Sequence, residues 1–223
     1  LWQLDGSEIA QFNGHTGAIR STTFSPDGQM LLSSSSDKTI ALWNLQGDLL
    51  QTFIGHTATV WSARFSPDGK LIVSGGADKT VKIWNLDGTE LKTITGHRGD
   101  VRTVLFSPNG EWIISGGADK TIMIWNLDGT LLHSIKGHTA DIRSISISPC
   151  GTLIASGSGD NILKLWHITS INNPSEQDAD SSAQIEIEEV FSIQAHTSAI
   201  RSVCFSPDGQ RLASGSADKQ IKL

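Results

Sequence analysis

One segment returns almost unchanged along the chain. It reads SGGADKTVKIWNLDGT over residues 74–89 and SGGADKTIMIWNLDGT over residues 115–130. Looser copies fill the rest, and a tryptophan closes each copy at a constant spacing, at Trp2, Trp43, Trp84, Trp125 and Trp166. A fixed period of this size is typical of repeat architectures, in which each unit packs on its neighbours. The sequence therefore predicts an array of like units rather than a single irregular core.

Composition and cysteine placement predict a soluble, cytoplasmic chain. Of its 223 residues, 38% are hydrophobic, which is enough for a substantial core, and no apolar run is long enough to cross a membrane. The two cysteines, Cys150 and Cys204, fall in different repeats and at different places within them, which favours neither a disulfide framework nor a metal-ligand spacing. We expect reduced thiols, no metal, no cofactor and no membrane partner.

Each repeat contains four short stretches with β-strand character, separated by turn signals. In the second repeat these stretches are residues 49–54, 59–65, 71–74 and 81–86. The turn Ser66-Pro67-Asp68-Gly69 joins the second stretch to the third, because proline presets φ at the second turn position and glycine accepts a positive φ. Four antiparallel strands joined in this way form one small sheet, so we predict an all-β fold.

Such a sheet cannot bury both of its faces alone, so the copies must pack on one another. Gly-His, then Ser-Pro-Asp-Gly, then Ser, Asp and Trp at fixed offsets resembles the WD40 repeat family, and the resemblance covers the entire chain. It implies a β-propeller segment of five four-stranded antiparallel blades, each repeat giving its first strand to the preceding blade. The expected repeats are residues 3–43, 44–84, 85–125, 126–166 and 167–223.

The number of blades is a separate question. Members of the WD40 family most often close with seven blades, so the resemblance implies part of a seven-bladed or longer array. A closed five-bladed ring is the alternative, because propellers of four to eight blades exist.

The resemblance also assigns a structural set of His, Ser, Asp and Trp to every repeat. The sets are His15, Ser33, Asp37 and Trp43; His56, Ser74, Asp78 and Trp84; His97, Ser115, Asp119 and Trp125; His138, Ser156, Asp160 and Trp166; and His196, Ser214 and Asp218. The same residue types compose a nucleophilic triad, in which a carboxylate orients the histidine that activates a hydroxyl. A catalytic set occurs once, whereas this one recurs, so we interpret it as architecture and expect no catalytic residue.

The fourth repeat departs most from the pattern. Asn161-Ile162 replaces Lys-Thr and Cys150 replaces the turn aspartate, so we expect the geometry of this hairpin to differ. His138 and His196 lie further apart than the other successive histidines of the pattern, which indicates an insertion. The excess, about residues 170–186, is acidic and lacks apolar periodicity, which predicts a flexible surface loop. Such a loop can recruit a basic partner, although a merely solvated loop is the simpler interpretation.

Candidate partner-binding residues lie at the start of one strand in each repeat. The resemblance places this position at the top of the propeller near the channel mouth, and here it is occupied by Arg20, Trp61, Arg102, Arg143 and Arg201. Guanidinium groups hold carboxylate or phosphate groups bidentately, and Arg and Trp are common interface anchors. Internal pairing is the alternative for two of them, because Asp100 and Asp141 lie two residues before Arg102 and Arg143.

These features predict a non-catalytic scaffold, docking or sensor module that binds a protein or peptide, acidic or phosphorylated, and no small-molecule substrate. Binding of nucleic acid through the top arginines is the weaker alternative, because only Trp61 is placed to stack on a base and no basic run is present. The regular repeats resemble arrays appended to bacterial signalling enzymes, which implies a role in signalling.

Overall fold

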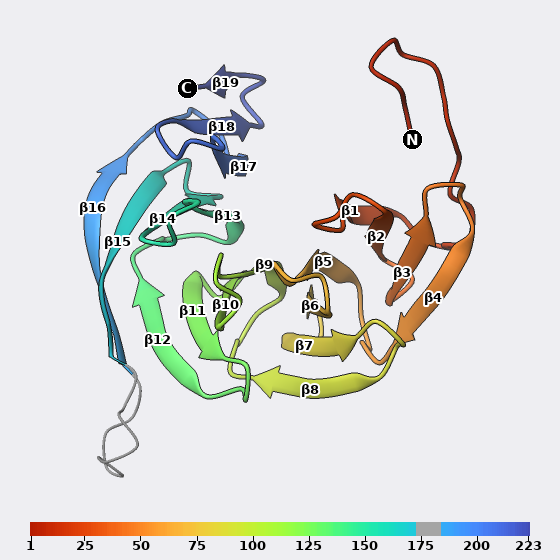
Figure 1. Ribbon diagram of the computed structural model, residues 1–223. Helices are drawn as coiled ribbons and strands as arrows, with labels where there is room; N and C mark the ends of the chain where they lie inside the picture. Colours follow the sequence, from red (N-terminus) through yellow and green to blue (C-terminus); the bar gives the residue numbers. More distant parts are fainter. Residues whose placement is uncertain (173–183) are drawn as a thin grey trace. The chain divides into compact units, whose positions relative to one another are not determined.

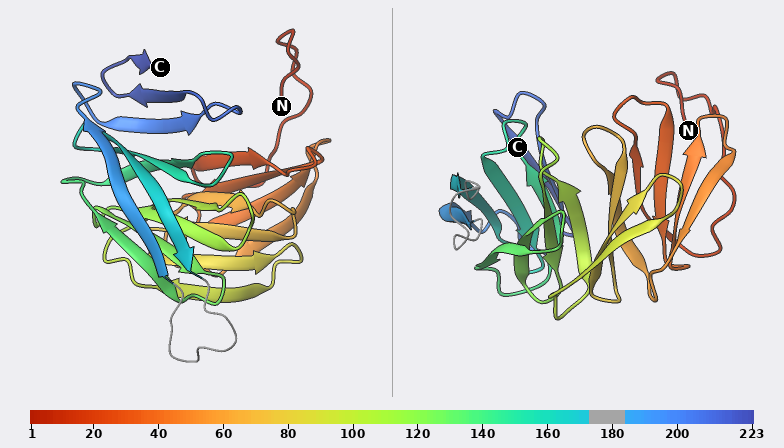
Figure 2. Two further views of the ribbon diagram at one scale, coloured as in Figure 1. Left: turned by 60° about the vertical axis from the view of Figure 1, so that its left-hand side comes forward. Right: turned by 60° about the horizontal axis from the view of Figure 1, so that its bottom comes forward.

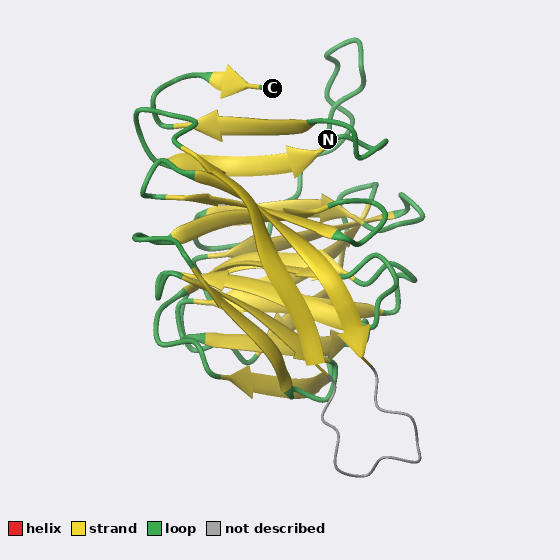
Figure 3. Cartoon of the chain, turned by 90° about the vertical axis from the view of Figure 1, so that its left-hand side faces the viewer, coloured by secondary structure: helices red, strands yellow, loops and turns green. Residues whose placement is uncertain are grey.

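The computed structural model describes residues 1–172 and 184–223 (Figure 1). Its chain separates into two compact units, Leu1–Phe106 and Ser107–Leu223. The described residues form strands and loops (Figure 3), and they include no helix long and apolar enough to cross a lipid bilayer. The central part of the predicted acidic insertion, residues 173–183, lies outside the described residues.

The first unit contains two complete antiparallel sheets and one further strand. Its strands are β1 (Ile19–Phe24), β2 (Met30–Ser35), β3 (Thr39–Asn44), β4 (Leu49–Ile54), β5 (Val60–Phe65), β6 (Leu71–Gly76), β7 (Thr80–Asn85), β8 (Glu90–Thr95) and β9 (Val101–Phe106). Strands β1 to β4 pair in sequence order, and so do β5 to β8. The four strand stretches expected in the second repeat are therefore confirmed, with small changes at their ends.

The second unit continues the same pattern. Its strands are β10 (Trp112–Gly117), β11 (Thr121–Asn126), β12 (Leu131–Lys136), β13 (Ile142–Ile147), β14 (Leu153–Ser158), β15 (Leu163–Asn172), β16 (Gln184–Ile193), β17 (Ile200–Phe205), β18 (Leu212–Ser216) and β19 (Ile221–Lys222). Strands β10 to β12 pair in order, β13 to β16 form a four-stranded sheet, and β17 to β19 form a three-stranded one. The described strands belong to five antiparallel sheets in all, which are the five predicted blades.

Each four-stranded sheet takes its outer strand from the next repeat. Strand β4 belongs to the second repeat but pairs with β3 of the first, from Thr39 opposite Ile54 to Trp43 opposite Leu49. Strand β8 pairs with β7 in the same register relationship, from Thr80 opposite Thr95 to Trp84 opposite Glu90. The predicted exchange of strands between successive repeats is thus observed, and it ties each sheet to the next through the chain itself.

The hairpin between the second and third strands of each sheet has one residue in the left-handed region. Lys79 adopts φ 69°, and Lys38, Lys120 and Lys219 lie between 70° and 75°. Asn161 occupies this position in the fourth repeat with φ 69°. Asparagine enters the left-handed region more readily than most residues, so its presence preserves the turn. The expected difference in the fourth hairpin is therefore absent at this position.

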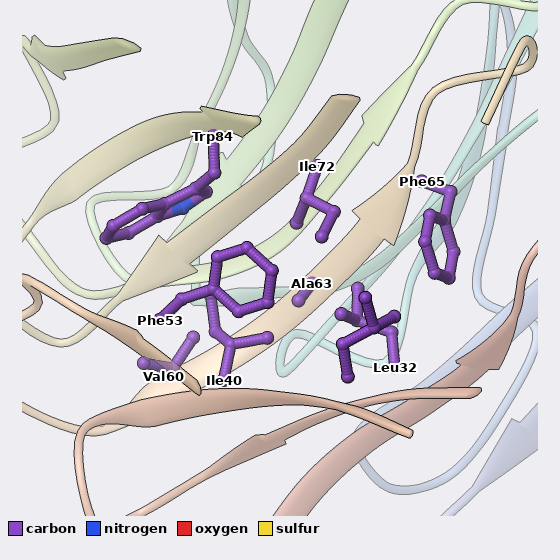
Figure 4. Close-up of a cluster of buried hydrophobic side chains, with 9 residues drawn as sticks. Leu32, Ile40, Phe53, Val60, Ala63, Phe65, Ile72 and Trp84 are labelled. Atoms are coloured by element: carbon purple, nitrogen blue, oxygen red, sulfur yellow. The ribbon is translucent and has the colours of Figure 1, made fainter. Parts of the chain in front are cut away.

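The core of the first unit lies between its two sheets. Leu32 and Ile40 of one sheet and Val60 and Ile72 of the other are at most 1% exposed and belong to one cluster (Figure 4). The ring of Phe53 meets that of Trp84 edge to face, with centroids 5.9 Å apart. Burial of each large aliphatic side chain contributes about 1.5 to 3 kcal/mol, so this seam fixes the two sheets together.

The acidic insertion extends a hairpin. Strands β15 and β16 reach Asn172 and Gln184 and run side by side as a long twisted pair (Figure 2), so residues 170–172 and 184–186 are strand where a loop was expected. The expectation was wrong for these residues because their apolar positions alternate with polar ones, with Ile185 opposite Ile171 and Ile187 opposite Ile168. Ile185 and Ile168 are only 3% and 7% exposed, so burial holds this part of the extension.

Candidate functional site

The histidine, serine, aspartate and tryptophan of the second repeat form one chain of hydrogen bonds. His56 Nδ1 lies 2.8 Å from Asp78 Oδ2, and its Nε2 lies 2.8 Å from Ser74 Oγ. Trp84 donates its indole N–H to the same Ser74 Oγ at 2.8 Å. With Nδ1 protonated toward the carboxylate, Ser74 donates its proton to Nε2 and accepts from Trp84, so every polar atom has a complementary partner.

The aspartate of this chain is held in its charged form. Burial alone would raise the pKa of Asp78, but hydrogen bonds from His56, from the Thr57 backbone and from Thr80 outweigh it and leave the pKa well below its usual value. The Thr57 N–H donates to Oδ2 at 2.9 Å, and the Thr80 hydroxyl donates to Oδ1 at 2.8 Å. A charged acceptor strengthens the bond to Nδ1–H and so fixes the histidine tautomer.

The same bonds recur in the other repeats. Nδ1 of the histidine lies 2.8 to 3.0 Å from the aspartate in the pairs His15–Asp37, His138–Asp160 and His196–Asp218. Nε2 lies 2.8 or 2.9 Å from the serine in the pairs His15–Ser33, His138–Ser156 and His196–Ser214. The indole donates to the serine at 2.8 or 2.9 Å in the pairs Trp43–Ser33, Trp125–Ser115 and Trp166–Ser156.

This geometry is unsuited to nucleophilic chemistry. Ser74 and Ser156 are 0% exposed, and the oxygen of each already accepts a hydrogen bond from tryptophan. A serine nucleophile must reach a substrate carbonyl beside donors for the oxyanion, which a fully enclosed hydroxyl cannot do. The third set has residues in both compact units, because His97 belongs to the first and Asp119 to the second. His97 is buried.

The candidate partner-binding residues of the first unit lie together. Trp61 on β5 is approached by Arg20 on β1 and Arg102 on β9, whose Cζ atoms lie 4.7 and 4.1 Å from the centroid of the indole ring. These distances are within the range of cation–π attraction, which is worth about 0.5 to 2 kcal/mol depending on exposure. We call Arg20, Trp61 and Arg102 the Arg–Trp–Arg stack.

Polar contacts fix the orientation of the Arg–Trp–Arg stack. The Trp61 indole donates to Asp100 Oδ2 at 3.2 Å, and Arg102 Nη2 lies 3.3 Å from the same oxygen. Arg20 donates through Nε to Ser36 Oγ at 2.7 Å. The internal pairing of Asp100 with Arg102, which was the alternative to a partner-binding role for this arginine, is observed. The stack and Asp100 together contribute two guanidinium groups and one carboxylate, and it is Arg102 that pairs with this carboxylate.

Arg143 and Arg201 lie in the second unit, at the equivalent positions of β13 and β17. Arg143 is half-buried, and its guanidinium packs beside Gly159, whereas Arg201 is exposed. Within the first unit, the structure therefore brings together three of the five candidate residues. Their stacking was missed in the sequence, although Arg20, Trp61 and Arg102 occupy the same position of three successive repeats, which was the signal available.

No group of three or more His, Cys, Asp or Glu side chains within residues 1–172 and 184–223 is arranged to hold a metal ion.

A hollow beside the first histidine set has a volume of about 200 Å³ and is lined by Gly14, His15, Asp37, Ala41, Trp43 and Thr52, among others. Its polar groups include those of the first set, which are already joined to one another by hydrogen bonds.

Comparison with protein-family models matches this chain to the family described as WD domain, G-beta repeat. The matched segments are residues 6–44, 47–85, 88–126, 129–167 and 187–223, which together span most of the chain. Each segment contains one of the recurring histidine, serine and aspartate sets.

Proposed function

Because the chain belongs to the WD40 repeat family, whose propellers are typically non-catalytic protein-interaction scaffolds, we propose that it is a docking module for a protein or peptide. The partner presents carboxylate or phosphate groups to the Arg–Trp–Arg stack. The observation that carries this proposal is the approach of two guanidinium groups to Trp61, at 4.7 and 4.1 Å from its ring centroid.

Stacking prepares the arginines for an anionic partner. A guanidinium group that packs its flat face on an indole ring still presents its N–H edge, which is the part that grips carboxylate and phosphate oxygens. The contacts of Arg20 with Ser36 and of Arg102 with Asp100 restrict both side chains before any partner arrives. Less conformational entropy is then lost on binding, which favours affinity.

Exposure also suits this role. Arg20 is exposed, whereas Trp61 and Arg102 are half-buried, so the cluster combines an accessible charge with an anchored aromatic ring. Arg and Trp side chains of this kind carry much of the binding energy in protein interfaces. Arg143 and Arg201 extend the same proposal to the second unit, where they stand at the equivalent strand position.

Nucleic acid remains the alternative partner, because its phosphates would also meet the arginines. The contacts around Trp61 speak against it. A base needs an accessible aromatic face on which to stack, and two guanidinium groups already lie over this ring. A role in signalling, a cytoplasmic location and membership of a longer array stay predictions.

The test compares peptide binding by the wild-type chain with binding by Arg20→Ala. The peptides share one sequence in acidic, phosphorylated and neutral forms, and calorimetry gives their affinities. We expect the acidic or phosphorylated form to bind best and Arg20→Ala to weaken it by about tenfold, the loss typical of an interface anchor.

Arg211→Ala is the matched control, because Arg211 is an exposed arginine of the second unit outside the candidate set. It removes the same charge and should leave the affinity unchanged. Equal losses of affinity in the two variants would show that binding depends only on the net charge of the protein. Tight, steeply salt-dependent binding of an oligonucleotide without any affinity for acidic peptides would favour the alternative.

A further inference from the structure

The turn before β14 holds a thiol where the same turn of three other repeats holds a carboxylate. In three repeats the aspartate Oδ1 accepts a hydrogen bond from the serine hydroxyl two residues before it, at 2.5 or 2.6 Å, and another from a backbone N–H at 3.0 or 3.1 Å; these aspartates are Asp27, Asp68 and Asp208. In the third repeat the amide oxygen of Asn109 accepts the same two bonds, at 2.6 and 3.2 Å, so this turn holds a hydrogen-bond acceptor, which is charged in three repeats. Cys150 stands at the equivalent position of the fourth repeat.

Cys150 keeps the serine hydroxyl that contacts the aspartates and has a threonine hydroxyl as its second neighbour. Its Sγ lies 3.2 Å from Ser148 Oγ and 3.1 Å from Thr152 Oγ1. Ser148 Oγ accepts the Leu153 N–H at 3.0 Å, as the turn serines of other repeats do, so its own proton is available for the sulfur. Hydrogen bonds from Ser148 and Thr152 lower the pKa of the Cys150 thiol to about 7. The thiol is exposed, so reagents can reach it.

A pocket of about 460 Å³ opens beside this thiol, entirely within the second unit. It is lined by Cys150 and Thr152, by Pro108, Asn109 and Trp112, and by Thr169 of β15. Trp112 is only 3% exposed, and its indole N–H has no hydrogen-bond partner among the described residues. A buried donor without an acceptor costs about 1 to 3 kcal/mol, so an occupant whose acceptor reaches this N–H would gain stability.

We propose that Cys150 is a site of reversible thiol–disulfide exchange, at which a small peptide disulfide leaves one of its halves covalently attached and lodged in the pocket lined by Trp112. This inference does not depend on the proposed docking function. It assigns a modification site to a position that breaks the repeat, where a thiol has replaced an aspartate.

The exchange balances without a further reagent. The Cys150 thiolate attacks one sulfur of the incoming disulfide, a new sulfur–sulfur bond forms at Sγ, and the old bond breaks. The other half leaves as a thiolate and takes a proton from water. One disulfide is consumed and one is formed, so no net oxidation occurs. A second small thiol reverses the reaction by the same route.

Three features favour a small peptide disulfide over other reagents. A thiol with a pKa near the ambient pH is the best attacking group in this exchange. The volume of the pocket falls in the range that encloses small organic ligands. Peptide carboxylates and carbonyls are acceptors, which the indole N–H of Trp112 lacks. A hydroperoxide, in contrast, is too small to fill the pocket and does not need the Trp112 N–H to react with the thiol.

The test uses the full chain, reduced and then exposed to glutathione disulfide at pH 7. Peptide mass mapping follows attachment at Cys150 and at Cys204, which is also exposed and serves as the internal reference. We expect Cys150 to react about threefold faster or more, because the fraction of thiolate grows more than its nucleophilicity falls. Cys204→Ser should leave this rate unchanged, and Cys150→Asp should fold and not react.

Two further variants separate the thiol from the pocket. Thr152→Val removes one donor to the sulfur and should slow both glutathione exchange and alkylation by iodoacetamide. Thr169→Trp fills the pocket and should slow exchange with glutathione disulfide while leaving alkylation unchanged, whereas Thr169→Ser should affect neither. The proposal is overturned if the two cysteines react equally, if Thr169→Trp has no selective effect, or if only hydrogen peroxide modifies Cys150.

Discussion

Lys82 Nζ lies 2.9 Å from Glu90 Oε2, in an ion pair whose lysine side chain is only 9% exposed. The ammonium group also donates to Thr93 Oγ1 at 2.6 Å and lies 5.9 Å from the centroid of the Trp84 ring. Lys164 and Glu189 form the same pair at 2.7 Å in a sheet of the second unit. Charge is thus packed against the buried tryptophan in two of the five sheets.

The chain itself supplies an apolar substitute for this pair. Met123 and Leu131 occupy the positions of Lys82 and Glu90 in the third repeat and its following strand, with Leu131 opposite Trp125 as Glu90 is opposite Trp84. We predict that the double variant Lys82→Met, Glu90→Leu has a free energy of unfolding within about 1 kcal/mol of wild type, or higher, because desolvation of the buried ammonium group offsets much of the gain from the pair.

Glu90→Leu alone should be clearly less stable, by about 2 kcal/mol or more, because it leaves Lys82 buried without its carboxylate. Urea unfolding of both variants measures the difference. A double variant that is clearly less stable than wild type would show that the pair contributes net stability here.

Removal of one aspartate from a recurring set should destabilise the fold. Asp78→Ala takes away the acceptor of His56 Nδ1, of the Thr57 N–H and of the Thr80 hydroxyl. We predict a loss of about 1 to 3 kcal/mol, because the buried His56 loses its acceptor and two neighbouring donors lose theirs. Thermal melting followed by circular dichroism measures it. Asp87→Ala is the control, since Asp87 is an exposed turn residue, and equal melting of the two variants would refute the structural role of the set.

Stability should fall in two stages as the pH is lowered. Burial lowers the pKa of His138 below its usual value of about 6.5 despite its contact with Asp160. Below about pH 6.5 the unfolded chain therefore binds a proton that the folded chain does not, and stability falls. The carboxyl groups of Asp37 and Asp78 have lowered pKa values, so their contribution is present above about pH 4 and is lost as the pH falls further.

Urea midpoints at a series of pH values would show both stages. His138→Gln removes the first titration, so its midpoint should depend less on pH between 5 and 7 than that of wild type, whatever its absolute stability. Curves that are parallel over this range would exclude His138 as the cause.

Gly75 marks a place where two strands of the first unit approach closely. A Cβ atom added there would lie 2.6 Å from Val101 Cγ1 and 2.9 Å from Val104 Cγ1. Gly75→Ala should therefore cost about 1 to 3 kcal/mol through overpacking. The equivalent Gly215 has no atom within 4 Å of such a Cβ, so Gly215→Ala should be tolerated. Chemical denaturation of the two variants checks the contrast, and a similar loss in both would point to backbone effects instead.

Much of the fold could be predicted from the sequence because the same pattern of turns, strands and buried positions recurs in every repeat. The four strand stretches of the second repeat and the exchange of strands between repeats were predicted correctly. The extension of β15 and β16 was not predicted, because the acidic residues around Ile185 and Ile187 suggested a solvated loop and drew attention away from the alternation of apolar and polar residues. Acidic composition indicates solvent exposure of side chains, and it does not exclude a strand whose other face is covered.

The candidate site was predicted less completely. Sequence position identified Arg20, Trp61 and Arg102 as equivalent, but not that their side chains stack. Stacking depends on how far one strand is displaced from the next, which residue spacing alone does not determine. The pairing of Asp100 with Arg102 was predictable because it acts within one short segment.

The exchange of outer strands between neighbouring sheets affects how a gene that encodes this kind of repeat protein can gain or lose repeats. The two most similar copies, residues 74–89 and 115–130, lie one repeat period apart, so recombination between their coding sequences adds or removes one whole repeat in frame. Wherever the recombination point falls within the repeat, the outer strand that a sheet takes from the next repeat is replaced by the equivalent strand of another copy. Each remaining sheet then keeps its strand number and register, and the protein can evolve in whole blades.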